Sequence, residues 1–213
     1  MDIQKLHKTY NLIKKDIAAR LAEFKLLWKN STDEEIFTEL CFCLCTPQTK
    51  AVNADKAIKI LVKNRLLFDG TADEISEYLQ GLVRFHNNKA KYIVEARQFF
   101  SSNGRFFIKQ RIDGKNIKAT RLFFLENIKG LGLKEASHFL RNIGFGDELA
   151  ILDRHILKNL VLLKVIDEIP QNLDKKNYLW IEQKLEKFAA KIKIPMDYLD
   201  FILWQNETGK IFK

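Results

Sequence analysis

The sequence predicts an all-α protein, because its apolar residues recur at the spacing of helices and not of strands. Between residues 4 and 29 an apolar residue returns every three or four positions, which is the stripe of a long amphipathic helix. A second helix is apolar nearly all round through residues 40 to 44, as buried helices are, and Pro47 ends it. No alternating strand pattern with hairpin chemistry is sustained anywhere in the chain.

Capping residues and helix breakers place the remaining elements. Ser31 and Thr32 each stand three residues before a glutamate, so either can open a capping box. Asn87-Asn88 is expected to cap the helix that follows it, and Ser101 to Asp113, with its Ser-Ser-Asn-Gly and Asp-Gly turns, is expected to be a loop. Further helices are expected over about 51–62, from Thr71 to before Gly81, and over about 89–100, 120–127, 134–142, 154–165, 176–191 and 196–208.

The charge of the chain indicates a polyanionic partner. Lysine and arginine outnumber the acidic residues, the net charge is +9, and the sequence pI is about 9.4. The basic residues are scattered over the chain and form no tail, and nucleic acid is the first partner that such a surface suggests. A solvated lysine-rich surface of the thermophile kind is the alternative.

The composition also indicates the cellular compartment. The chain has no apolar run of about 18 residues and no signal-peptide pattern, so we expect one compact cytoplasmic unit without a membrane span. Cys41, Cys43 and Cys45 alternate within one apolar segment, where a helix would turn Cys43 away from the other two. They are interpreted as small buried hydrophobic residues in a reducing compartment, with metal binding as the remote alternative.

Residues 128–155 contain a turn that can bind phosphate. Gly130 and Gly132 interrupt two helical segments, and alternate glycines allow positive φ and a close approach of the backbone to a ligand. The amide groups that open the second helix attract anions such as phosphate. This pattern predicts a helix-hairpin-helix, and the alternative is a tight turn between helices that binds nothing.

Two further residues suggest chemistry at this turn. Lys134 lies in the first turn of the second helix, where the dipole disfavours an ammonium ion, and a neutral lysine amine is the nucleophile that forms Schiff bases. Asp153 follows 19 residues later, before the apolar run 156–165, where the helix dipole keeps a carboxylate ionised. Taken singly, a surface lysine and a simple helix cap remain the alternatives.

These motifs together resemble the helix-hairpin-helix DNA glycosylase superfamily. The superfamily's Gly-h-Gly-x-Lys hairpin stands here as residues 130–134, and its Asp-x-His segment stands as 153–155. Residues 46–51, Thr-Pro-Gln-Thr-Lys-Ala, are similar to the segment that fills the gap left by a flipped base, and 85–93 to the Asn-x-Lys-Ala helix start. Within the superfamily the chain is most similar to the short archaeal and thermophile class of 8-oxoguanine DNA glycosylase. Lys129 departs from the proline that relatives often carry there, and is a rival lysine.

The resemblance implies roles for individual residues. Lys134 would be the nucleophile and Asp153 would stabilise the charge that develops on the sugar. Asp200 and Trp204 share a helix face at i, i+4 and could bond and stack a purine, although a surface charge and a core anchor are the alternatives. The other assignments are a base pocket completed by Phe85, His138 and Lys213, and DNA contacts from Gln48, Gly130, Gly132 and His155.

The resemblance also implies an organisation and a set of partners. Residues 1–213 would form one glycosylase domain, with a lobe of about 32–145 that carries the hairpin 128–140, a second lobe from 1–30 and 154–213, and the base in the cleft between them. The chain cannot hold the superfamily's C-terminal iron-sulfur cluster, because it has no cysteine after Cys45. We expect no cofactor beyond a cation that could sit at the hairpin, and a monomer that acts on double-stranded DNA containing oxidised guanine. An endonuclease III-like pyrimidine glycosylase and a non-catalytic DNA-binding module are the alternatives.

Overall fold

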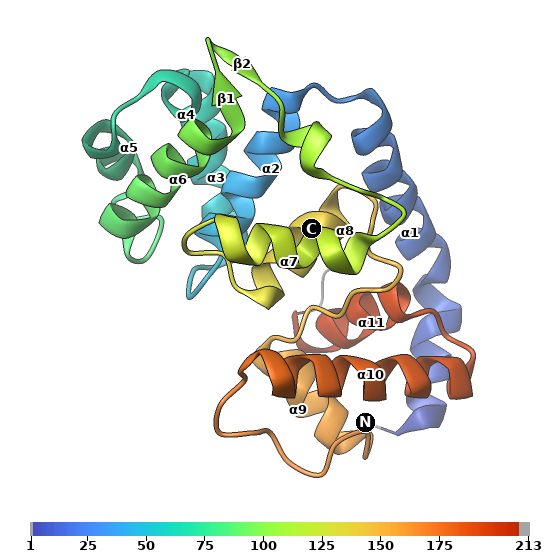
Figure 1. Cartoon of the computed structure of the whole chain (residues 1–213). Helices are drawn as coiled ribbons and strands as arrows, with labels where there is room; N and C mark the ends of the chain where they lie inside the picture. Colours follow the sequence, from blue (N-terminus) through green and yellow to red (C-terminus); the bar gives the residue numbers. More distant parts are fainter. Residues whose placement is uncertain (1, 209–213) are drawn as a thin grey trace. The chain divides into compact units, whose positions relative to one another are not determined.

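The computed structural model describes residues 2–208, with side chains as far as residue 205, and it confirms the all-α prediction. Eleven α-helices, one two-stranded hairpin and one 3-10 turn make up this part of the chain (Figure 1). The α-helices are α1 (Ile3–Asn30), α2 (Asp33–Cys45), α3 (Ala51–Lys63), α4 (Leu66–Asp69), α5 (Ala72–Leu79), α6 (His86–Phe100), α7 (Ile117–Asn127), α8 (Leu133–Asn142), α9 (Arg154–Leu162), α10 (Lys175–Ile192) and α11 (Met196–Thr208).

The chain divides into two compact units. One, here called the central unit, is residues 27–139 and contains α2 to α7 with most of α8. The other, the terminal unit, is formed by the chain before residue 27 and after residue 139, and contains most of α1 together with α9, α10 and α11. The predicted single glycosylase domain with its two functional lobes stays a prediction.

The core of the central unit forms around α2. Thr32 is its N-cap and exchanges hydrogen bonds with Glu35, so Thr32 and not Ser31 opens the capping box. Nearly every residue of α2 from Ile36 to Cys45 is buried, as its apolar sequence predicts, and α3 and α6 pack against it (Figure 1). The three cysteines remain thiols; burial raises the pKa of Cys41 well above its ordinary value and that of Cys45 to about 12.

Two expectations about the central unit are wrong. The cap predicted at Asn87-Asn88 lies inside α6, which begins at His86 after Phe85 in a left-handed conformation. Asn87 uses its side chain in a tertiary contact instead, because its Oδ1 accepts a hydrogen bond from Ser76 Oγ of α5. A propensity rule for caps cannot anticipate that partner.

The segment predicted as a loop, 101–113, is ordered by its neighbours. It forms the hairpin β1 (Ser101–Ser102) and β2 (Arg105–Phe106), followed by the 3-10 turn Ile108–Arg111. Lys109 holds the turn, since its amide donates to Asp33 Oδ1 at 2.7 Å and its Nζ donates to the carbonyl groups of Trp28 and Ser31. Strands of two residues carry too little alternation to be predicted from sequence.

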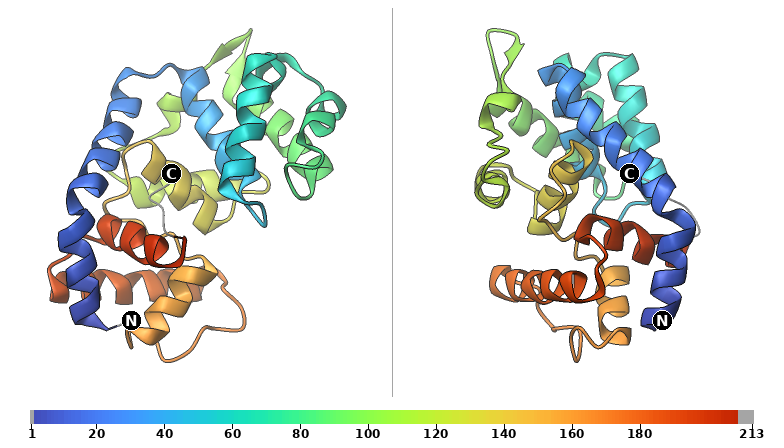
Figure 2. Two further views of the ribbon diagram at one scale, coloured as in Figure 1. Left: turned by 180° about the vertical axis from the view of Figure 1, so that it is seen from behind. Right: turned by 90° about the vertical axis from the view of Figure 1, so that its right-hand side faces the viewer.

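The terminal unit packs helices against an irregular segment. α9 and α11 lie side by side (Figure 1, Figure 2), and α9 ends at Leu162, three residues before the predicted end, because Lys164 takes a positive φ. Phe24 of α1 stacks on Phe201 of α11, and the guanidinium of Arg141 lies 5.3 Å and 4.6 Å from the centroids of these two rings.

A buried carboxyl group makes the stability of the terminal unit depend on pH. Burial raises the pKa of Asp197 from 3.8 to about 6, and the nearby Asp147 adds to this, while the Tyr198 amide and Lys25 act in the opposite direction. The folded state therefore holds this proton more tightly than the unfolded chain does. The free energy of unfolding must fall as pH rises from about 4 to about 6.

We expect Asp197→Asn to stabilise the protein at pH 7 by at most about 3 kcal/mol, because asparagine carries no charge to desolvate. The advantage should disappear at about pH 3 and below, where Asp197 is protonated in both the folded and the unfolded state. Urea unfolding at the two pH values measures it, with the exposed Asp167→Asn as the control for a change in net charge. An equal effect of Asp197→Asn at both pH values would contradict this account.

Candidate active site

The turn between α7 and α8 brings its backbone close to a side chain of α6. Of its two glycines, only Gly130 has a positive φ, of 83°. A Cβ at Gly130 would overlap the ring of Tyr92 on α6, whereas a Cβ at Gly132 would meet only the end of the Glu135 side chain. The expectation that both glycines supply positive φ is therefore wrong for Gly132. Gly130 is therefore the position of the two that needs glycine, both for its positive φ and because a side chain would overlap Tyr92.

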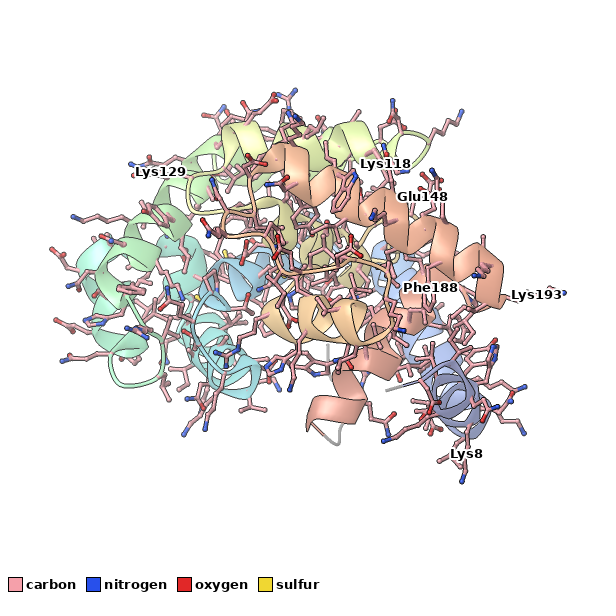
Figure 3. All side chains as sticks on the ribbon, turned by 90° about the horizontal axis from the view of Figure 1, so that it is seen from below. Lys8, Lys118, Lys129, Glu148, Phe188 and Lys193 are labelled. Carbon is pink, nitrogen blue, oxygen red and sulfur yellow. The ribbon has the colours of Figure 1, made fainter. Side chains whose placement is uncertain are left out.

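Lys134 lies at the start of α8, directly after the hairpin. Its side chain is 25% exposed, and its Nζ is 3.2 Å from Glu135 Oε1 in an ion pair. The rival Lys129 is 66% exposed and lies at the surface of the turn (Figure 3). Its Nζ forms an ion pair with Glu95 at 3.5 Å. Lys134 is thus the enclosed lysine of the two. Sequence reasoning missed Glu135, whose only signal was its place beside the lysine.

Gln48 stands in a tight turn after α2. The amide of Thr49 donates to the carbonyl of Thr46 at 3.0 Å, with Pro47 second in the turn and Gln48 third. Gln48 has φ of 55°, as the third residue of a type II turn requires, and its side chain is exposed. A residue with a long side chain held there costs conformational energy and projects outward.

Phe85 shares these two properties. Its φ is 58°, and its side chain is 50% exposed, which is unusual for a large apolar residue. The guanidinium of Arg84 lies 5.1 Å from the centroid of the Phe85 ring. Gln48 and Phe85 are thus two of the exposed side chains that the central unit presents on backbone in the left-handed region.

Asp153 is the N-cap of α9 in the terminal unit. Its Oδ1 accepts the amide hydrogens of His155 and Ile156, each at 2.8 Å. Within residues 2–208 its other oxygen, Oδ2, has no hydrogen-bond partner, and the side chain is partly exposed. The cap and a chemical role are compatible, because they use different oxygens.

Two residues of α10 fix the segment that leads to Asp153. The hydroxyl of Tyr178, which is buried, donates to the carbonyl of Ala150 at 2.7 Å and accepts from the Leu152 amide. The carboxylate of Glu182 accepts the Ala150 amide at 2.8 Å. Sequence reasoning gave Tyr178 and Glu182 no role, because their partners are about 30 residues away along the chain and give no local pattern.

The remaining predicted residues fall in three places. His155 and Trp204 meet in the terminal unit with ring centroids 5.5 Å apart, edge to face. Asp200 forms an ion pair with the buried Arg141 at 3.9 Å, so it is not a simple surface charge. His138 is buried in the central unit, 5.7 Å from the Phe42 ring centroid. Lys213 lies outside the described residues.

Among the side chains that the structure describes, no group of three or more His, Cys, Asp or Glu is placed to hold a metal ion. No helix between residues 2 and 208 is long and apolar enough to cross a membrane.

We expect Gly130→Ala to be much more destabilising than Gly81→Ala. Gly81 also has a positive φ, of 76°, but a Cβ there would meet no atom within 4 Å. The control should therefore cost only the backbone strain, about 1 kcal/mol, and Gly130→Ala roughly 1–3 kcal/mol more because of the overlap with Tyr92. Denaturant unfolding measures both; equal losses would mean that Tyr92 moves aside freely.

The chain is similar to known proteins over most of its length. The Ogg-HhH family model, described as 8-oxoguanine DNA glycosylase, matches residues 17–194. A protein of Fusobacterium nucleatum named 8-oxoguanine DNA glycosylase/AP lyase is 47% identical over 209 residues, which are 98% of this chain and 96% of the relative. A protein of the same name from Methanocaldococcus jannaschii is 40% identical, and the match covers both chains completely.

Solved structures agree with the sequence matches. The Methanocaldococcus jannaschii 8-oxoguanine glycosylase/lyase, solved in complex with a 15mer DNA containing 8-oxoguanine, superposes with a TM-score of 0.88 at 39% identity over 99% of each chain. The 8-oxoguanine DNA glycosylase of Thermotoga maritima gives a TM-score of 0.86 at 33% identity, over 99% of this chain and 98% of that one.

Proposed function

Because the chain belongs to the Ogg-HhH family of 8-oxoguanine DNA glycosylases, we propose that it excises 8-oxoguanine from duplex DNA and cleaves the abasic strand. The observation that carries the proposal is the match, over 99% of both chains, to a relative solved with DNA that contains this base. The hairpin and the enclosed Lys134 supply the parts that such a reaction needs.

Recognition begins with rotation of the damaged nucleotide out of the duplex, which costs a few kcal/mol of stacking and pairing. Gln48, exposed at the tip of its turn, fills the gap. Phe85 and Trp204 stack on the two faces of the extruded base, while Asp200 bonds its edge. His138 completes the pocket. The exposed ring of Phe85 and the ion-paired carboxylate of Asp200 support these assignments.

The chemistry uses Lys134 as the nucleophile. Once its amine is neutral and released from Glu135, the nitrogen lone pair forms a bond to C1′ and the bond from C1′ to the base breaks, with its electrons leaving on the base. Asp153 Oδ2 stabilises the positive charge that develops on the sugar. Opening of the sugar ring gives a Schiff base, and loss of a proton from C2′ expels the 3′ phosphate by β-elimination.

The hairpin holds the DNA while this happens. The amide groups of Gly130 and Gly132, with His155, bind phosphates on the damaged strand, and a cation could share that site. No organic cofactor is needed, because Lys134 supplies the covalent chemistry. We propose that the protein acts as a monomer in the cytoplasm, bound to chromosomal DNA, and the net charge of +9 supports that association.

We expect Lys134→Gln to keep binding to 8-oxoguanine DNA but to lose base release and strand cleavage by about 10³-fold or more, because an amide cannot act as the nucleophile. Borohydride trapping on a duplex with 8-oxoguanine opposite cytosine measures the covalent adduct. Lys129→Gln is the matched control and should trap like the wild type. An adduct retained by Lys134→Gln and lost by Lys129→Gln would move the nucleophile to position 129.

The same experiment separates the proposed function from its rivals. A wild-type adduct with oxidised pyrimidines and none with 8-oxoguanine would indicate a different lesion class. Binding without an adduct on any oxidised base would indicate a DNA-binding module.

We expect Asp153→Asn to slow base release by about 10²-fold, because the neutral amide cannot offset the charge on the sugar. Asparagine is also a good N-cap, so α9 should keep its start and the melting temperature should change little. Single-turnover base release, read beside thermal unfolding, tests the two parts separately. An unchanged rate would reduce Asp153 to a helix cap.

A further inference from the structure

Lys89 of α6 is a buried lysine to which the proposed reaction gives no role. Its residue is 4% exposed. Its Nζ donates to the carbonyl of Cys45 at 2.8 Å, to the carbonyl of Pro47 at 2.7 Å and to Thr49 Oγ1 at 3.3 Å. An ammonium group has three hydrogens and no acceptor, so these three bonds satisfy it fully.

The three acceptors belong to the turn that carries Gln48. Cys45 is the last residue of α2, where carbonyl groups lack helical partners and the dipole favours a cation. Pro47 and Thr49 flank Gln48 on either side. The Lys89 side chain therefore bonds to the residue before the turn, to the second residue of the turn and to its last residue.

The same contacts reach the second exposed residue. Thr49 Oγ1 also accepts the backbone amide hydrogen of Arg84, at 3.1 Å. Arg84 immediately precedes Phe85, and the carbonyl of Phe85 accepts the amide of Lys89 itself at 3.1 Å. Lys89 is thus linked to Gln48 through the turn and to Phe85 through both Thr49 and its own backbone.

Both exposed residues need such support. Gln48 and Phe85 have φ of 55° and 58°, and neither is glycine. Left-handed backbone at such residues persists only where the surroundings determine it, and it is common where a ligand is held. Without the ammonium, the turn would lose its three hydrogen bonds to α6, and the bond from the Arg84 amide to Thr49 Oγ1 would have to hold it alone against the segment before α6.

We propose that Lys89 is a positioning residue that fixes Gln48 and Phe85 for extrusion of the damaged base. This inference rests on the proposed function, because it assigns those two side chains to the gap and the base. Lys89 does not touch the DNA in this account. Its loss should impair the step in which a base must leave the duplex, and should leave the chemistry of Lys134 largely intact.

The charge of Lys89 is compatible with this role. Burial lowers the pKa of Lys89 to about 8, and the ammonium of Lys134 adds to that effect, while Cys45 and the Glu135 carboxylate act against it. The carbonyl and hydroxyl oxygens around Nζ offset the loss of water around the ammonium. A methionine would fill the same volume without any of these bonds.

The test compares two substrates for Lys89→Met. Base release from a duplex with 8-oxoguanine opposite cytosine should slow by about tenfold or more, the scale of a lost hydrogen bond to a charged group. Cleavage of a duplex with a preformed abasic site should stay within about twofold, because no base has to be extruded. A 2-aminopurine beside the lesion should show a smaller fluorescence rise on binding. Lys91→Met, an exposed charge change on the same helix, should leave all three readouts unchanged.

Two further variants distinguish a positioning role of Lys89 from a general loss of folding. Thr49→Val removes one acceptor and keeps Lys89. It should slow base release less than Lys89→Met does, and should again leave cleavage of the preformed abasic site unchanged. In a Gln48→Ala background, Lys89→Met should cost less than it does alone, because part of its effect has already been removed. Equal losses on both substrates, or strictly additive effects, would overturn the positioning role. Wild type inactive on 8-oxoguanine would instead overturn the proposed function.

Discussion

A helix that is buried on nearly every side must satisfy its last carbonyl groups without water, and α2 of the central unit is such a helix. The chain meets this constraint in two ways. Thr46 donates its amide and its hydroxyl to the carbonyl of Cys43, and Lys89 reaches across from α6 to the carbonyl of Cys45. The hydrogen-bonding requirement of one helix end therefore determines where the next turn and α6 must lie.

The terminal unit meets a comparable requirement around an irregular segment. The residues before α9 have backbone groups that no helix satisfies, and Tyr178 and Glu182 supply the missing partners from α10. Asp153 then satisfies the first amide groups of α9 with one oxygen. In each unit, polar side chains that satisfy backbone groups outside the helical hydrogen-bond pattern thus hold a segment that carries a residue with a proposed role, which is Gln48 in the central unit and Asp153 in the terminal unit.

Sequence reasoning succeeded where the signal is local. The stripe of α1, the apolar sequence of α2 and the box opened by Thr32 depend on residues that are neighbours along the chain, and the hairpin depends on Gly130 and the helices beside it. It failed where the partner is distant. Asn87 forms a hydrogen bond with Ser76 and does not cap α6. Lys109 orders a segment whose sequence predicts a loop. Lys89 likewise gained its role only from partners that lie about 40 residues away along the chain.

The burial of the three cysteines has a chemical consequence for a protein of this kind. Peroxides react with thiolates, and a thiol that is enclosed in apolar surroundings, with its pKa raised as at Cys41 and Cys45, offers almost no thiolate at neutral pH. Oxidised guanine accumulates under the same conditions that convert exposed thiols to sulfenic acids. The central unit thus keeps its sulfur atoms out of reach of the oxidants that create its proposed substrate.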